Sequence, residues 1–207
     1  MSQSTFSNTQ TGGQPADPYK AKNIEEVPLK EKVEDLVAFA KHCKFGMMTT
    51  NSHGFLVSRC MALADTEGGG VDLIFHTNTE SGKTDELHLD PKTNISFLNP
   101  TGEWASISGE ASIVTDRATV QKYYSETLKA WLGDLGDGVH DGGPEDPRIG
   151  IIKVKAHTVT YCISRKGIIG SSIEFAKGLV KGDVPVINKI REISVEELQQ
   201  WRQTSGQ

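Results

Sequence analysis

Six segments within residues 45–164 show the alternation of apolar and polar residues expected of β-strands, and this succession constrains the fold more than any other feature of the chain. Two of them, within residues 45–64, flank a tight turn at Asn51-Ser52-His53-Gly54, and the others cover 71–78, 92–100, 103–116 and 148–164. Because the strands are short and no long parallel crossover joins them, the pattern favours a small antiparallel barrel with flanking helices. Gly109 is predicted to mark a bulge, and the last strand is predicted to bend near Ala156-His157.

Three helices are predicted beside the strands. The spacing of apolar residues indicates an amphipathic helix over 29–42, a second helix starts at a Thr79 or Ser81 cap and runs to about His88, and a third spans 117–132 behind an Asp116 cap. Residues 1–23 are polar and without periodicity, so we expect a disordered N-terminal extension there. The barrel domain is then 24–165, and 166–207 is a C-terminal extension in which SVEE predicts a capping box and a short helix over 194–203.

Composition excludes several classes of protein. The formal net charge is -5 and the isoelectric point about 5.7, which argues against a nucleic-acid binder and means that few, well-placed cations must hold any anionic ligand. The cysteine count is odd, at 3, and lacks CxxC spacing, which favours a reducing compartment. No apolar run approaches the roughly 20 residues of a membrane span, and the N-terminal segment lacks a signal-peptide core, so we expect a cytoplasmic protein.

No metal site is predicted. The six histidines are scattered, and none has the i, i+4 spacing of helical metal ligands. The acidic segment 134–146 lacks the residue order of an EF-hand, so we expect a flexible loop there.

The strongest chemical signal is the run FHTNTESGKTDEL at residues 75–87. A strand ends and a helix begins where Ser81 and Lys83 lie, and free amides at a helix start attract a phosphate group. Arg59 can add a bidentate grip if strand pairing places it beside Phe75. This predicts a phosphomonoester site, although no P-loop motif is present. The alternative, in which Ser81 is only a cap and Lys83 only a solvated lysine, has about even odds from spacing alone.

Four runs in this order resemble a known family: SRCMAL, LIFHTNTESGKTDEL, KTNISFLNP and EWASISGEASIV. They are similar to the FMN-binding split-barrel proteins, above all the pyridoxamine 5'-phosphate oxidase-like general stress protein group with its blue-light-inducible fungal members. The resemblance covers about residues 33–163. It implies a six-stranded split β-barrel that works as a homodimer with two FMN sites at the interface.

The resemblance also implies roles for individual residues. Arg59 and Lys83 would hold the FMN phosphate, with Ser81 as a donor. The other implied contacts are Ser58, Cys60 and Met61 along the flavin edge, Phe75, His76 and Thr77 at the ring and ribityl chain, Trp104 and Ser106 on the strand that pairs across the dimer, and Trp131 from the second subunit. For His76 a structural role or a flavin contact is favoured over a general base, Cys60 is first a core thiol, and the two tryptophans are as often plain core or interface aromatics.

Two functions stay open. The chain is expected to be an FMN-dependent oxidoreductase, with a small-molecule redox partner and no assignable catalytic residue, or a non-catalytic flavin binder that stores or senses FMN. No Arg-x-His-type motif follows the last strand, so pyridoxamine phosphate oxidase activity is not expected. A third possibility is a barrel-shaped interaction module that binds no cofactor. The identity of the cofactor also stays open, because related split barrels bind F420 or haem as well as FMN.

Overall fold

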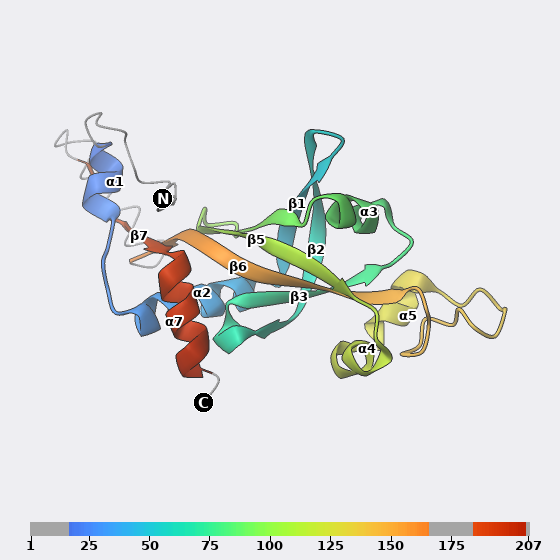
Figure 1. Cartoon of the computed structure of the whole chain (residues 1–207). Helices are drawn as coiled ribbons and strands as arrows, with labels where there is room; N and C mark the ends of the chain where they lie inside the picture. The colour runs from blue at the N-terminus through green and yellow to red at the C-terminus, as the bar shows by residue number, and fades with distance from the viewer. Residues whose placement is uncertain (1–16, 166–183, 206–207) are drawn as a thin grey trace.

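The computed structural model describes residues 17–165 and 184–205. In chain order the elements are α1 (Pro18–Asn23), α2 (Leu29–Cys43), β1 (Phe45–Ser52), β2 (Phe55–Glu67), the 3-10 turn η1 (Gly68–Gly70), β3 (Asp72–Asn78), α3 (Gly82–Leu89), β4 (Lys92–Leu98), β5 (Trp104–Val114), α4 (Arg117–Tyr123), α5 (Thr127–Leu132), β6 (Ile149–Ser164), β7 (Asn188–Ile193) and α7 (Val195–Ser205). In Figure 1, α1, β7 and α7 gather at one end of the sheet, and α4 and α5 lie at the other.

Six antiparallel strands close into a barrel, as the sequence predicts. Their order is β3-β2-β1-β4-β5-β6, and pairing of β3 with β6 closes the ring. The hairpin between β1 and β2 has His53 and Gly54 at its tip with φ of 52° and 87°, which is the left-handed conformation of a two-residue turn. None of the described helices is long and apolar enough to cross a membrane.

A bulge bends β5 and β6 together. Ser108 pairs with Thr158 but Gly109 pairs with Ala156, so His157 is the extra residue and both predicted irregularities are confirmed. A Cβ at Gly109 would lie 2.2 Å from the Lys155 carbonyl oxygen, which explains why glycine is needed there. Beyond the bulge, β6 leaves β3 and pairs with β7.

The barrel interior is the main core. Met48, Phe75, Ile95 and Ile107 line it with exposed fractions of 1% or less, and Leu36 of α2 packs against them. A second cluster lies on the outer side of β3 and β6, where Ile74, Ile149 and Ile151 meet α4. Strands β3 and β6 are therefore apolar on both faces.

Four predictions about local structure need correction. Residues 17–23, expected to be disordered, contain α1, because the buried Asn23 side chain accepts from the amides of Ile187 and Asn188. Residues 1–16 and 166–183 lie outside the described residues. Strand β7 was not predicted, and the helix predicted over 117–132 is two helices because Tyr124 is extended.

The capping box at the start of α7 is confirmed. The Ser194 amide donates to Glu197 Oε2 at 2.8 Å, and the Glu197 amide donates to Ser194 Oγ at 3.2 Å. The helix continues two residues further than predicted, to Ser205.

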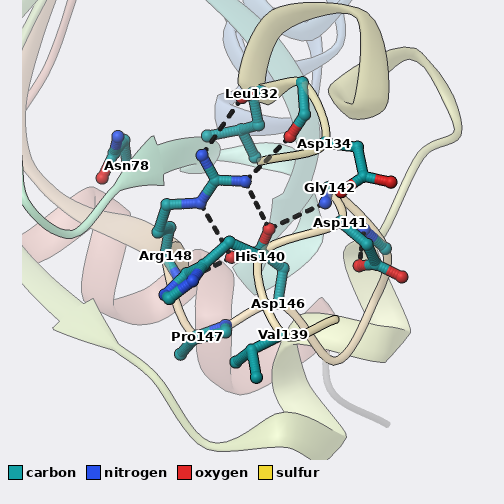
Figure 2. A network of polar contacts seen from close by, with 12 residues as sticks. Asn78, Leu132, Asp134, Val139, His140, Asp141, Gly142, Asp146, Pro147 and Arg148 are labelled. Atoms are coloured by element: carbon teal, nitrogen blue, oxygen red, sulfur yellow. Dashed lines mark hydrogen bonds and ion pairs between the residues drawn. The ribbon is translucent and has the colours of Figure 1, made fainter. Parts of the chain in front are cut away.

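The fourth correction concerns the acidic loop. The buried Asp146 and Arg148 side chains form an ion pair of 2.7 Å, which Figure 2 shows as a dashed line. The guanidinium also donates to the Leu132 and Gly133 carbonyls at the end of α5. The Gly142 amide donates to Asp146 as well. A buried ion pair therefore fixes the loop at this end, where a flexible segment was predicted.

Candidate functional site

Arg59 is held between β1, β2 and α3. It shares the half-buried face of β2 with Val57 and Met61, as the alternation predicts, and its side chain is 25% exposed. Its Nη1 donates to Thr50 Oγ1 at 2.6 Å, and its Nη2 pairs with Glu86 Oε2 at 2.7 Å. The guanidinium group therefore has a defined position beside the first turns of α3.

The turn into α3 is organised around Asn78. The Ser81 hydroxyl donates to the Asn78 carbonyl at 2.7 Å, and the Thr84 hydroxyl donates to the same oxygen at 3.2 Å. Lys83 folds back over this turn, and its Nζ donates to Ser81 Oγ at 2.8 Å. Ser81 occupies the cap position of α3, although its side chain makes no hydrogen bond to a helix amide. The helix start thus carries a hydroxyl and an ammonium group in contact.

Arg59 and Lys83 influence each other electrostatically. Burial lowers the pKa of Lys83, and the positive charge of Arg59 lowers it further. Burial acts to raise the pKa of Glu86, but hydrogen bonds from Thr50 and Arg59 outweigh it, so that this pKa lies below its ordinary value. Glu86 is therefore ionised at neutral pH. Among the described residues no carboxylate lies within ion-pair distance of Lys83. The carboxylate of Glu86 is therefore the counter-charge for both Arg59 and Lys83.

The predicted pairing of Arg59 with Phe75 is wrong. Arg59 pairs with Met48 of β1, and Phe75 pairs with Leu63. Strand β2 is long, and β3 pairs only with its second half, from Leu63 to Glu67, where a bulge follows Leu63. Arg59 reaches the start of α3, one turn beyond the end of β3, instead of the middle of β3.

The three predicted residues of β3 point in two directions. Phe75 is fully buried in the barrel core, and Thr77, on the same side, is 6% exposed. His76 faces α4, where its Nε2 lies 2.6 Å from the Tyr123 carbonyl oxygen, and burial lowers its pKa. The side chain of Phe75 is thus committed to the core, which leaves only its backbone for a ligand.

The remaining predicted residues lie mostly on the outer face of the barrel. Ser58 and Cys60 are exposed on β2, where Ser58 Oγ lies 2.8 Å from Thr49 Oγ1, whereas Met61 packs against the core. On β5, Trp104 is half-buried and Ser106 accepts a hydrogen bond from Asn94. Trp131 on α5 is 87% exposed. Within one chain, Arg59, Ser81 and Lys83 therefore lie together, and Trp104 and Trp131 are not part of this cluster.

An open groove of about 510 Å³ shares Thr50 with this cluster, although Arg59, Ser81 and Lys83 do not line it. Its lining includes Thr50, Asn94, Ser108 and His157, and Thr50 is also the residue that accepts from Arg59. The volume lies within the range of small-molecule sites. No group of three metal-ligating side chains occurs in the described part of the chain.

Thr50 and Glu86 were missed by the sequence reasoning. Glu86 follows Lys83 by three residues, so helix geometry places both on one face, and that spacing could have drawn attention to it. Nothing local marks Thr50, because its role depends on how β1 packs against α3.

The comparisons agree with this fold. The family model described as "Pyridoxamine 5'-phosphate oxidase like" matches residues 31–185, and the chain belongs to this family. It is 60% identical over 206 residues to "Protein bli-3" of Neurospora crassa, with 98% of this chain and 99% of that protein covered.

Solved structures share the fold at lower identity. General Stress Protein 26 from Bacillus anthracis is 23% identical, with 64% of this chain and 92% of that chain covered and a TM-score of 0.52. A putative general stress protein 26 from a Jannaschia species is 17% identical, with 81% and 99% covered and a TM-score of 0.61. A pyridoxamine 5'-phosphate oxidase-related, FMN binding protein from Nostoc punctiforme is 14% identical, with 69% and 87% covered and a TM-score of 0.53. The predicted family and split-barrel fold are confirmed.

Proposed function

We propose that this chain binds FMN and that Arg59, Ser81 and Lys83 hold its phosphate group. The observation that carries the proposal is the convergence of two cations at the start of α3 with a single carboxylate beside them. An FMN binding protein with the same fold supports the choice of ligand.

The residues present fit a phosphate group. Lys83 and Ser81 are already in contact, and Arg59 retains N–H donors beyond those used by Thr50 and Glu86. Charge-assisted hydrogen bonds from these groups and the dipole of α3 would favour a dianion. The groove that shares Thr50 with the cluster has room for part of a ligand larger than phosphate.

The outer face of the barrel supports a homodimer. Phe45 of β1 is 57% exposed and pairs with Ala62, and Leu98 of β4 is 71% exposed and pairs with Trp104. Met47, beside them on the outer side of β1, is 41% exposed. Apolar side chains gathered on one face are typical of a protein interface. In such a dimer Trp131 would reach the flavin from the partner subunit, and Trp104 and Ser106 would lie on the strand that pairs across the interface. Ser58 and Cys60 would contact the flavin from this subunit with their exposed side chains. Met61, His76 and Thr77, whose side chains face the core or α4, would offer backbone groups.

The activity we propose is that of a flavin-dependent oxidoreductase. Bound FMN supplies the hydride or electron transfer, and the protein supplies position and electrostatics. Arg59 and Lys83 anchor one end of the ligand, and Thr50 and Glu86 fix Arg59. His76 is half-buried, burial lowers its pKa and it faces α4, so it is not placed as a general acid for a ligand on the barrel's outer face.

The second candidate is a non-catalytic FMN binder that stores or senses flavin. It is favoured by the chemistry of the cluster, whose groups anchor a phosphate and include no evident acid or base. All three cysteines are free thiols, which supports the proposed cytoplasmic location for either function.

Two measurements test the proposal: the identity of the ligand that co-purifies, and the dependence of binding affinity on the phosphate group of FMN. Mass and absorbance analysis should identify FMN, while F420, haem or a colourless protein would contradict the proposal. Lys83→Met should weaken FMN binding by about tenfold or more, because a charge-assisted hydrogen bond is lost. Riboflavin, which lacks the phosphate, should bind the variant and the unaltered protein equally, and Lys41→Met, an exposed lysine on α2, should change neither affinity.

Reduction of the bound flavin separates the two functions. Reduction by NADH or NADPH at a useful rate supports the oxidoreductase. If every common donor fails although FMN binds tightly, the storage or sensing function is the better description.

A further inference from the structure

Glu86 already forms an ion pair with Arg59, the arginine that would bind the phosphate group. We infer that Glu86 is an internal counter-ion of the site, which competes with the phosphate for Arg59 and so selects against ligands that offer a phosphate group and little else. The inference rests on the proposed function, since it concerns the same site.

The geometry makes Glu86 a direct competitor. A single oxygen, Oε2, accepts from both Arg59 Nη2 at 2.7 Å and Thr50 Oγ1 at 2.6 Å. Glu86 stands one helical turn after Lys83, so it lies on the ligand side of α3 and not on its solvent side. Its side chain is only 17% exposed, and burial keeps water from screening its charge.

The charge balance gives the consequence. With Glu86 ionised, Arg59 and Lys83 leave the empty cluster with one net positive charge, although a phosphate dianion brings two negative ones. The carboxylate stabilises the ligand-free protein, because it neutralises a half-buried arginine. Once phosphate is bound, the same carboxylate lies close to an anion and repels it. Glu86 therefore stabilises the free state and weakens the complex.

This arrangement sets a minimum for the binding free energy that the rest of a phosphate compound must contribute. Inorganic phosphate has no further contacts to offset the repulsion, so it binds poorly. A ligand whose larger part also contacts the barrel or its groove can overcome it. A ligand would therefore need its phosphate group in order to bind at this site, but the phosphate group alone would not give tight binding.

The experiment compares Glu86→Gln with Asp85→Asn. Both remove one negative charge from α3, but Asp85 is exposed, and its carboxylate makes no described contact with Arg59. We expect Glu86→Gln to bind FMN about tenfold more tightly, because a unit charge within a few ångströms of the phosphate is removed. Asp85→Asn should change FMN affinity by no more than about twofold. Inorganic phosphate, titrated into the FMN-free proteins, should bind Glu86→Gln more tightly than the unaltered protein.

Two further measurements separate the explanations. The ligand-free Glu86→Gln protein should melt below Asp85→Asn, and riboflavin affinity should not change. If Glu86→Gln binds FMN no better than Asp85→Asn, or more weakly, Glu86 only positions Arg59 and the inference is overturned, while the proposed function stands. If the unaltered protein binds FMN and riboflavin equally, the phosphate site itself is wrong and both proposals fail.

Discussion

Replacing Arg191 with methionine should destabilise the protein by about 3 kcal/mol, and the reason is the number of carboxylates that surround it. The Arg191 side chain on β7 is fully buried, and its terminal nitrogens pair with Glu25 at 2.6 Å and with Glu31 and Asp35 at 2.7 Å each. Methionine fills a similar length but leaves three acidic groups without this cation. Loss of one partner of a buried ion pair costs about 3–5 kcal/mol.

The lower end of that range applies here because part of the charge stays compensated. Glu25 keeps Arg165 at 2.6 Å, and Asp35 keeps Lys189 at 3.7 Å. Glu31 is 49% exposed, so water screens it. For a chain of this length a loss of 3 kcal/mol corresponds to a fall in Tm of about 6–12 °C.

Urea unfolding at neutral pH measures the change, with the slope of the transition as a check that the same surface is exposed. Lys30→Met is the control, because Lys30 pairs with Glu34 at 3.7 Å between two well-exposed side chains and should cost at most about 1 kcal/mol. Adding Glu31→Leu to the Arg191 variant should restore part of the stability. A loss for Arg191→Met no larger than that of the control would refute the reasoning, since the cluster would then contribute nothing beyond a surface pair.

Three further changes test other parts of the fold. The Arg148 guanidinium holds the pKa of Asp146 at about 2. The stability that this pair contributes is therefore present above about pH 4 and is lost as the pH falls toward 2. The difference in unfolding free energy between the unaltered protein and Asp146→Asn should shrink over that pH range. Gly109→Ala should cost on the order of 3 kcal/mol because its Cβ would overlap the Lys155 carbonyl, whereas Gly82→Ala, with nothing within 4 Å, should be neutral or stabilising by up to about 1 kcal/mol; equal melting temperatures would contradict this. His53→Asn should raise stability by a few tenths of a kcal/mol, because asparagine adopts the positive φ of the hairpin tip more readily, and a lower Tm would show that His53 makes a contact of its own.

Features that depend on a few neighbouring residues could be predicted from the sequence. The His53-Gly54 hairpin, the bulge at Gly109 and the capping box of Ser194 each follow from local backbone chemistry. The same holds for the meeting of Ser81 and Lys83 at the start of α3, which required only that a strand end and a helix begin.

Features that depend on distant contacts could not be predicted. Helix α1 and strand β7 have weak patterns of their own, and each is stabilised by the other through Asn23. The pairing of Arg59 was misjudged because β3 pairs only with residues from Leu63 to Glu67 of the long strand β2, and Arg59 lies before them. Glu86 meets Arg59 only because α3 packs on β1, which no spacing within either element reveals.

The Arg191 cluster also has a consequence for how the chain is made. Glu31 and Asp35 of α2 precede Arg191 by 160 and 156 positions, so the acidic side of α2 is synthesised long before its neutralising arginine. Contacts of such long sequence separation form late in folding. The Glu31 and Asp35 carboxylates of α2 therefore stay exposed to water until the chain has been synthesised as far as Arg191. A chain that ends before β7 would keep all six strands of the barrel but would lack Arg191, the cation that pairs with the carboxylates of its N-terminal segment.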